Sequence, residues 1–119
     1  FDYTDKLRTL ANGDAWMAAA LKNLTTGSPT SAHVIFEHLR NSRGLSLREC
    51  FNLDMTLSCQ FARHPDLPEG IRALLIDKDN KPKWSPAELS EVTPASVRSH
   101  FEWPRHDRPN PLDRLLEEQ

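Results

Sequence analysis

The chain has 119 residues, 38% of them hydrophobic, and its 15 basic and 17 acidic side chains leave a formal net charge of −2. This composition is typical of one globular domain and excludes a disordered protein, and the small net charge gives no long-range field to attract nucleic acid or an anionic membrane. No apolar run approaches the roughly 20 residues of a membrane-spanning helix, and the first residues lack the layout of a signal peptide. We therefore expect a soluble intracellular protein and, because the sequence starts at Phe1 rather than Met, a processed chain or a piece of a longer protein.

Helix-start signals recur along the chain, and no segment alternates apolar and polar residues as a half-buried strand does. The predicted fold is all-α, a bundle of about five to seven short helices. A first helix over residues 3–10 ends at Asn12-Gly13, and Asp14 can cap a second helix that stops at Gly27.

Two stronger start signals follow. Ser28 can cap a helix that has Pro29 at its first position, where the missing N–H costs nothing, and this helix should reach about residue 40. Ser46 and Glu49 form a capping box for the longest helix, over residues 47–63, which His64-Pro65 ends.

The longest helix carries an apolar face that should be buried against its neighbours. Asp54 lies in the middle of that face, where a carboxylate must be paired or hydrogen-bonded, so we expect a structural polar residue there rather than part of a site. The residues that share the face are Leu47, Cys50, Phe51, Leu57 and Phe61.

A second capping box, Asp66 with Glu69, predicts the next helix. Its apolar stripe extends to Lys78, whose stem can run along apolar surface while its charge meets the negative end of the helix dipole. The stripe consists of Leu67, Ile71, Leu74 and Leu75.

The end of the chain is divided into small pieces. Ser85-Pro86 and Thr93-Pro94 each predict a short helical turn. We assign residues 1–103 to one helical region and residues 104–119 to a proline-rich tail with a short terminal helix, whose apolar residues are Leu112, Leu115 and Leu116. The tail has too little apolar surface to stand alone, so it either docks or frays.

No catalytic residue and no metal site is predicted, because the five histidines are scattered and there is neither a nucleophile elbow nor a glycine-rich phosphate loop. Residues 77–84 are the remaining candidate. Lys78, Lys81 and Lys83 crowd a turn beside Trp84, which fits either a solvated loop with a packed indole or a place for phosphate groups.

The same segment resembles a known family. Residues 67–79, Leu-Pro-Glu-Gly-Ile-Arg-Ala-Leu-Leu-Ile-Asp-Lys-Asp, followed by Pro-Lys-Trp at 82–84, look like the C-terminal signature of the enoyl-CoA hydratase/isomerase (crotonase) superfamily. The Ile-Asp-Lys-Asp ending, with residues 28–31 upstream and residues 91–101 downstream, is more similar to 3-hydroxyisobutyryl-CoA hydrolases.

This resemblance implies the C-terminal helical part of an enzyme that cleaves a β-hydroxyacyl-CoA thioester in valine breakdown. It places the oxyanion hole and catalytic carboxylates in a preceding core, and it gives this part the roles of covering the acyl-CoA cleft and making subunit contacts. Coenzyme A enters only as part of the substrate, with no separate cofactor. The implied partners are that N-terminal core and further copies of the chain, in the cytoplasm of a bacterium or the mitochondrial matrix of a eukaryote.

Two alternatives stay open at this point. One is a fragment of an enoyl-CoA hydratase/isomerase of other specificity, and the other is a non-catalytic helical module that binds a protein partner. The sequence upstream of residue 1 would separate an enzyme fragment from an interaction module, because only an enzyme fragment requires a crotonase core there.

Overall fold

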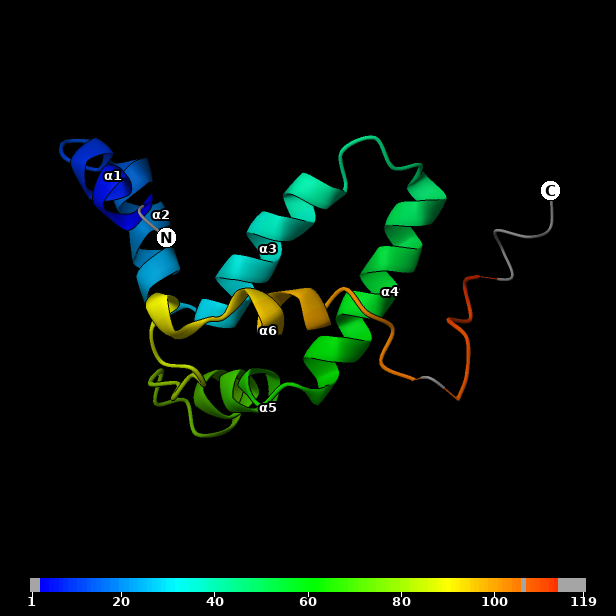
Figure 1. Cartoon of the computed structure of the whole chain (residues 1–119). Coiled ribbons are helices and arrows are strands. Elements are labelled where there is room, and N and C mark those ends of the chain that lie inside the picture. The colour runs from blue at the N-terminus through cyan, green and yellow to red at the C-terminus, as the bar shows by residue number, and fades with distance from the viewer. Residues whose placement is uncertain (1–2, 106, 114–119) are drawn as a thin grey trace.

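A computed structural model describes residues 3–105 and 107–113. Within these residues the regular structure is helical and contains no strand, so the predicted all-α class is confirmed (Figure 1). None of the described helices is long and apolar enough to cross a membrane. The elements are α1 Tyr3–Leu10, α2 Ala15–Thr26, α3 Pro29–Asn41, α4 Leu47–Arg63, α5 Asp66–Ile71, the π-helical η1 Arg72–Ile76, the 3₁₀ turn η2 Leu89–Glu91 and α6 Pro94–Ser99.

Four predicted helix starts are confirmed by side-chain caps. The Asp14 carboxylate accepts the N–H groups of the first turn of α2, and the Ser28 hydroxyl does the same for α3. Ser46 and Glu49 form the expected reciprocal box at α4, and Thr93 caps α6. These caps depend on residues within one turn, so the local sequence suffices to specify them.

The capping box predicted at Asp66 and Glu69 is wrong. Helix α5 follows Pro65 without a side-chain cap, and both carboxylates bind groups elsewhere in the chain. The turn expected from Ser85-Pro86 also forms later, as η2.

The helix that follows Asp66 is shorter than its apolar pattern predicts. At η1 the Asp77 N–H bonds to the Arg72 carbonyl five residues back, at 2.8 Å, and this π turn changes the phase of the helix before it ends at Ile76. Lys78 therefore lies beyond the helix, with a positive φ of 56°, and its predicted place on the apolar stripe is wrong.

The core is small and lies where α6 crosses α3 and α4 (Figure 1). Each of these helices contributes one buried aliphatic residue, and Val92, which follows η2, adds a fourth. The cluster consists of Val34, Leu57, Val92 and Val97, with Leu53, Phe61 and Phe101 packed against it.

The predicted burial of the Asp54 face is confirmed for Leu57 and Phe61 and wrong for its N-terminal part. Leu47 and Phe51 are 73% and 57% exposed, and the Asp54 side chain is 56% exposed with its Oδ1 3.6 Å from His38 Nε2 on α3. The core-facing side of α4 carries Leu57 and Phe61 from the predicted face and also Leu53, which the predicted face does not include.

The described part of the tail docks on α4. The Asn110 side chain is 4% exposed, and its Nδ2 donates to the Asn52 carbonyl at 3.2 Å and to the Asn52 Oδ1 at 2.9 Å. Asn52 Nδ2 in turn donates to Asp113 Oδ1 at 2.6 Å. Most of the predicted terminal helix, including Leu115 and Leu116, lies outside the described residues.

Candidate functional site

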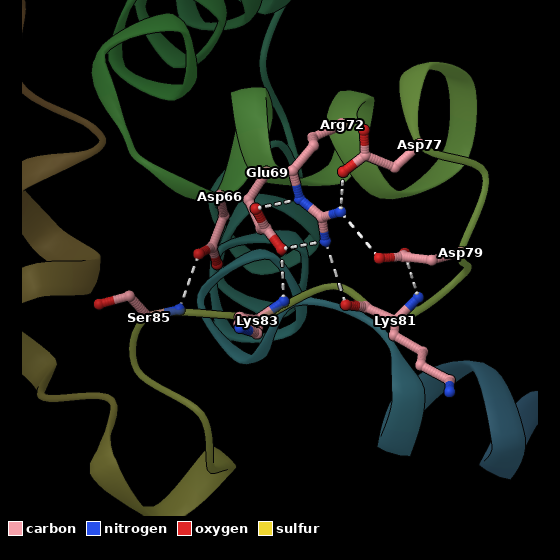
Figure 2. Close-up of polar contacts among 8 residues, drawn as sticks. All are labelled: Asp66, Glu69, Arg72, Asp77, Asp79, Lys81, Lys83 and Ser85. Carbon is pink, nitrogen blue, oxygen red and sulfur yellow. Dashed lines mark hydrogen bonds and ion pairs between the residues drawn. The ribbon is translucent and has the colours of Figure 1, made fainter.

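The most highly connected polar group of the described chain is the guanidinium of Arg72, at the start of η1 (Figure 2). Its Nε donates to Glu69 Oε2 at 2.9 Å and its Nη2 to Glu69 Oε1 at 2.8 Å. In this forked arrangement two planar N–H donors of arginine bind the two oxygens of one carboxylate. The single ammonium group of a lysine cannot make this pair of parallel bonds.

The remaining nitrogen of Arg72 reaches the turn that follows the helix. Nη1 donates to Asp77 Oδ2 at 2.5 Å and to Asp79 Oδ2 at 2.8 Å, and Nη2 also donates to the Lys81 carbonyl at 3.2 Å (Figure 2). A single cation thus binds three carboxylates and one backbone oxygen.

These contacts perturb the acids and the base in the expected directions. The Arg72 guanidinium, helped by a backbone N–H, lowers the pKa of Glu69 to about 2. The same guanidinium lowers the pKa of Asp79, and hydrogen bonds to Glu69, Asp79 and Asp77 raise the pKa of Arg72. Glu69, Asp79 and Arg72 are therefore charged at neutral pH.

The carboxylates also bind the backbone of the following loop. Glu69 Oε1 accepts the Lys83 N–H at 2.7 Å, and Asp79 Oδ1 accepts the Lys81 N–H at 2.8 Å (Figure 2). The loop's path is thus determined by side chains from α5 and from the loop itself.

Asp66 joins the far end of this loop to α3. Its side chain is 4% exposed, its Oδ1 accepts the Ser85 N–H at 2.8 Å, and its Oδ2 accepts the Ser28 hydroxyl at 2.5 Å. Three segments distant in sequence therefore meet at one buried carboxylate.

The predicted lysines lie on the outside of this network. Lys78, Lys81 and Lys83 are exposed, and the side chain of Lys81 extends away from Arg72 (Figure 2). Within residues 3–105 and 107–113, the carboxylates of Asp77 and Asp79 pair with Arg72 and not with these lysines. The structure brings the backbones of Lys81 and Lys83 into one network, while it leaves Lys78 outside it.

Trp84 has a packing role. Its indole Nε1 donates to the Thr26 carbonyl at the end of α2, at 2.9 Å. Its ring lies against Gly70 of α5, where an added Cβ would be only 3.3 Å from the indole Cη2. The indole therefore connects α2, α5 and the loop.

A cavity of about 700 Å³ opens beside the indole, between the end of α2, α3, α5–η1 and the loop. Its lining is mainly apolar, and several of its residues are exposed large hydrophobics. Those that define its walls are Ile35, Phe61, Leu67, Ile71, Leu74 and Trp84.

Sequence reasoning singled out the lysines but missed Arg72, Asp66 and Glu69 as the centre of the site. The Glu69–Arg72 spacing of three residues is a recognisable helical pair. The contacts to Asp77 and Asp79 depend on the π turn and on the reversal of the loop, for which the sequence gives no local signal. Among the described residues, no three His, Cys, Asp or Glu side chains are arranged to hold a metal ion.

Comparison with known sequences places this helical region in a family. Residues 2–101 match the family described as Enoyl-CoA hydratase/isomerase, and the chain belongs to that family. The match includes every helix of the structure and the Arg72 network.

The more specific similarity is to hydrolases. The chain is 39% identical over 93 residues to "3-hydroxyisobutyryl-CoA hydrolase-like protein 5" of Arabidopsis thaliana, covering 76% of this chain and 24% of the relative. It is 38% identical over 98 residues to the mitochondrial 3-hydroxyisobutyryl-CoA hydrolase of Dictyostelium discoideum (82% and 26%) and 38% identical over 90 residues to that of Homo sapiens (76% and 23%). The chain thus spans about a quarter of the length of these relatives.

Proposed function

We propose that this chain is the C-terminal helical part of an acyl-CoA thioester hydrolase that acts on 3-hydroxyisobutyryl-CoA in valine breakdown. The observation that carries the proposal is its similarity, over 76–82% of its residues, to proteins named as such hydrolases. The catalytic groups belong to the rest of the protein in this proposal, because the chain spans only about a quarter of the length of those hydrolases. Free coenzyme A release by the full-length protein, and none by this chain alone, is the expected result.

The exposed apolar surface supports a covering role. Ile35 and Leu39 on α3, and Leu47 and Phe51 on α4, are exposed, and the apolar cavity opens beside α5. Exposed apolar surface of this extent is typical of sites that contact other protein surface. We assign it to the N-terminal core of the same protein, over the acyl-CoA cleft, and to contacts between copies.

The lysine loop supports a contact with coenzyme A. With Asp77 and Asp79 bound to Arg72, the ammonium groups of Lys78, Lys81 and Lys83 remain available to the phosphates, and compact charges of this kind bind phosphate groups well. Trp84 supports the loop by packing, so the proposed contact rests on the lysines.

The contact is tested by replacing each lysine with alanine in the full-length protein. A lost phosphate contact should raise KM for the coenzyme A thioester by about tenfold for each 1.4 kcal/mol removed. KM for the truncated pantetheine thioester, which lacks those phosphates, should not change. Lys6→Ala in α1 removes the same charge away from the loop and is the control. Equal effects on both substrates, or none, would reject the assignment.

A second function is favoured by the family match itself, because the matching family is described as Enoyl-CoA hydratase/isomerase. The full-length protein would then hydrate or isomerise an enoyl-CoA without releasing the thiol. Assaying thiol release from 3-hydroxyisobutyryl-CoA beside loss of the enoyl absorbance of crotonyl-CoA separates the two.

For location we propose the mitochondrial matrix if the source is eukaryotic, as the names of the Dictyostelium and human relatives suggest for those proteins, and the cytoplasm if it is bacterial.

A further inference from the structure

The loop after η1 contains two residues other than glycine with a positive φ. Lys78 and Asn80 have φ values of 56° and 54°, in the left-handed region that residues with a Cβ seldom adopt. Such conformations persist only where the surroundings hold them, and they gather at binding and switch segments.

Arg72 contacts the residues that bracket those two positions. Its guanidinium binds the side chains of Asp77 and Asp79 and the carbonyl of Lys81, so the contacts fall at alternate residues and the left-handed positions lie between them. Figure 2 shows the three contacts meeting the guanidinium on the side away from Glu69, with the Lys81 side chain directed away.

Arg72 also determines the charge that the lysines experience. It neutralises part of the negative charge of Glu69, Asp77 and Asp79, which otherwise lie within a few residues of the three lysines. Without the guanidinium, those carboxylates would be free to pair with the lysine ammonium groups and to repel an anionic ligand.

We propose that Arg72 is a positioning residue for the phosphate-bearing end of coenzyme A. It does not touch the ligand. It holds residues 77–83 in the conformation that presents the lysines, and it occupies the carboxylates that would compete for them. This inference rests on the proposed function, because the ligand is taken from it.

Asp79→Ala in the full-length protein separates positioning from charge, because the two effects have opposite signs. Removing a negative charge beside the lysines would lower KM for an anionic substrate if only charge mattered. Removing the contacts to the guanidinium and to the Lys81 N–H should instead raise that KM, by about threefold to tenfold. Glu37→Ala on α3, whose partner is Arg40, removes the same charge and is the matched control.

Arg72→Gln should raise KM for the coenzyme A thioester by about tenfold or more and leave kcat and the pantetheine thioester within about twofold. Arg72→Lys keeps the charge without the fork and should recover only part of the loss. Arg98→Gln on α6 is the charge-matched control. In Arg72→Gln, amide hydrogen exchange at Lys81 and Lys83 should accelerate while the α4 amides stay protected, which distinguishes a loosened loop from an unfolded domain.

The outcomes are distinguishable. If the lysine variants raise KM for the coenzyme A thioester while Asp79→Ala lowers it or leaves it unchanged, the positioning role is overturned and the proposed function stands. If the lysine variants have no effect on KM, the proposed lysine contact fails and the inference fails with it. If Arg72→Gln does not fold, the sign of the Asp79→Ala effect still decides.

Discussion

Asp66→Ala and Asp54→Ala form a matched pair that tests which of the two carboxylates is buried and hydrogen-bonded. Asp66 is 4% exposed and bound by the Ser28 hydroxyl and the Ser85 N–H, whereas the Asp54 side chain is 56% exposed with one contact at 3.6 Å. Each hydrogen bond to a charged group contributes about 1.5–3 kcal/mol, and removing the carboxylate relieves its own desolvation. The expected loss in unfolding free energy is therefore about 3 kcal/mol for Asp66→Ala, against about 0–1 kcal/mol for Asp54→Ala.

Urea denaturation of this chain, monitored by the helical circular dichroism signal, measures the loss of unfolding free energy in each variant. The comparison holds if m, the dependence of the unfolding free energy on urea concentration, is the same in all variants. Asp66→Asn keeps an oxygen acceptor for one of the two donors and should fall between wild type and Asp66→Ala. Equal midpoints for the two alanine variants, or a larger loss at Asp54, would refute the assignment of the buried carboxylate.

Three further results are expected. Because Glu69 has a pKa of about 2 in the folded chain against an ordinary 4.5, its contribution to stability is complete above pH 4.5 and is lost as the pH falls toward 2, so the Lys83 amide resonance should titrate with a midpoint near 2. Gly70→Ala should displace the Trp84 indole Nε1–H resonance with little change in stability, because the gain in helix propensity offsets a 3.3 Å contact, and an unmoved resonance would contradict that packing. Asn110→Ala should cost about 1–3 kcal/mol and open the tail to proteases, and an unchanged cleavage pattern would show that the tail is not held there.

The sequence could predict helix starts wherever the cap and the capped N–H groups lie within one turn. Asp14, Ser28, Ser46 and Thr93 are such cases, and the 47–63 helix has the predicted bounds. No tertiary contact competes for these side chains strongly enough to displace them from the helix they begin.

The same reasoning failed at Asp66 and Glu69 because donors outside the first turn of the helix compete there. The residue types at positions 66 and 69 fit a capping box. In the structure, however, Asp66 accepts the Ser85 N–H, and Glu69 binds the Arg72 guanidinium and the Lys83 N–H. A charge-assisted, forked bond to a guanidinium is stronger than a bond to one backbone N–H, so Glu69 binds Arg72 rather than capping the helix. The candidate site depends on these non-local bonds, which explains why its lysines could be named from sequence while the groups that arrange them could not.

The error at α4 has a different cause, because it concerns which surface covers a helix rather than which bond forms. Apolar periodicity reports that Leu47 and Phe51 share a face, and they do, but it cannot report whether the covering surface lies within these 119 residues. Here Leu57 and Phe61 pack inside the chain beside Leu53, whereas the face formed by Leu47, Phe51 and Asp54 is left exposed. Under the proposed function that face contacts the rest of the protein. Charged substitution of Phe51 should then disrupt the full-length enzyme while leaving the melt of this chain nearly unchanged, and a large loss in the chain itself would show that the face is already packed.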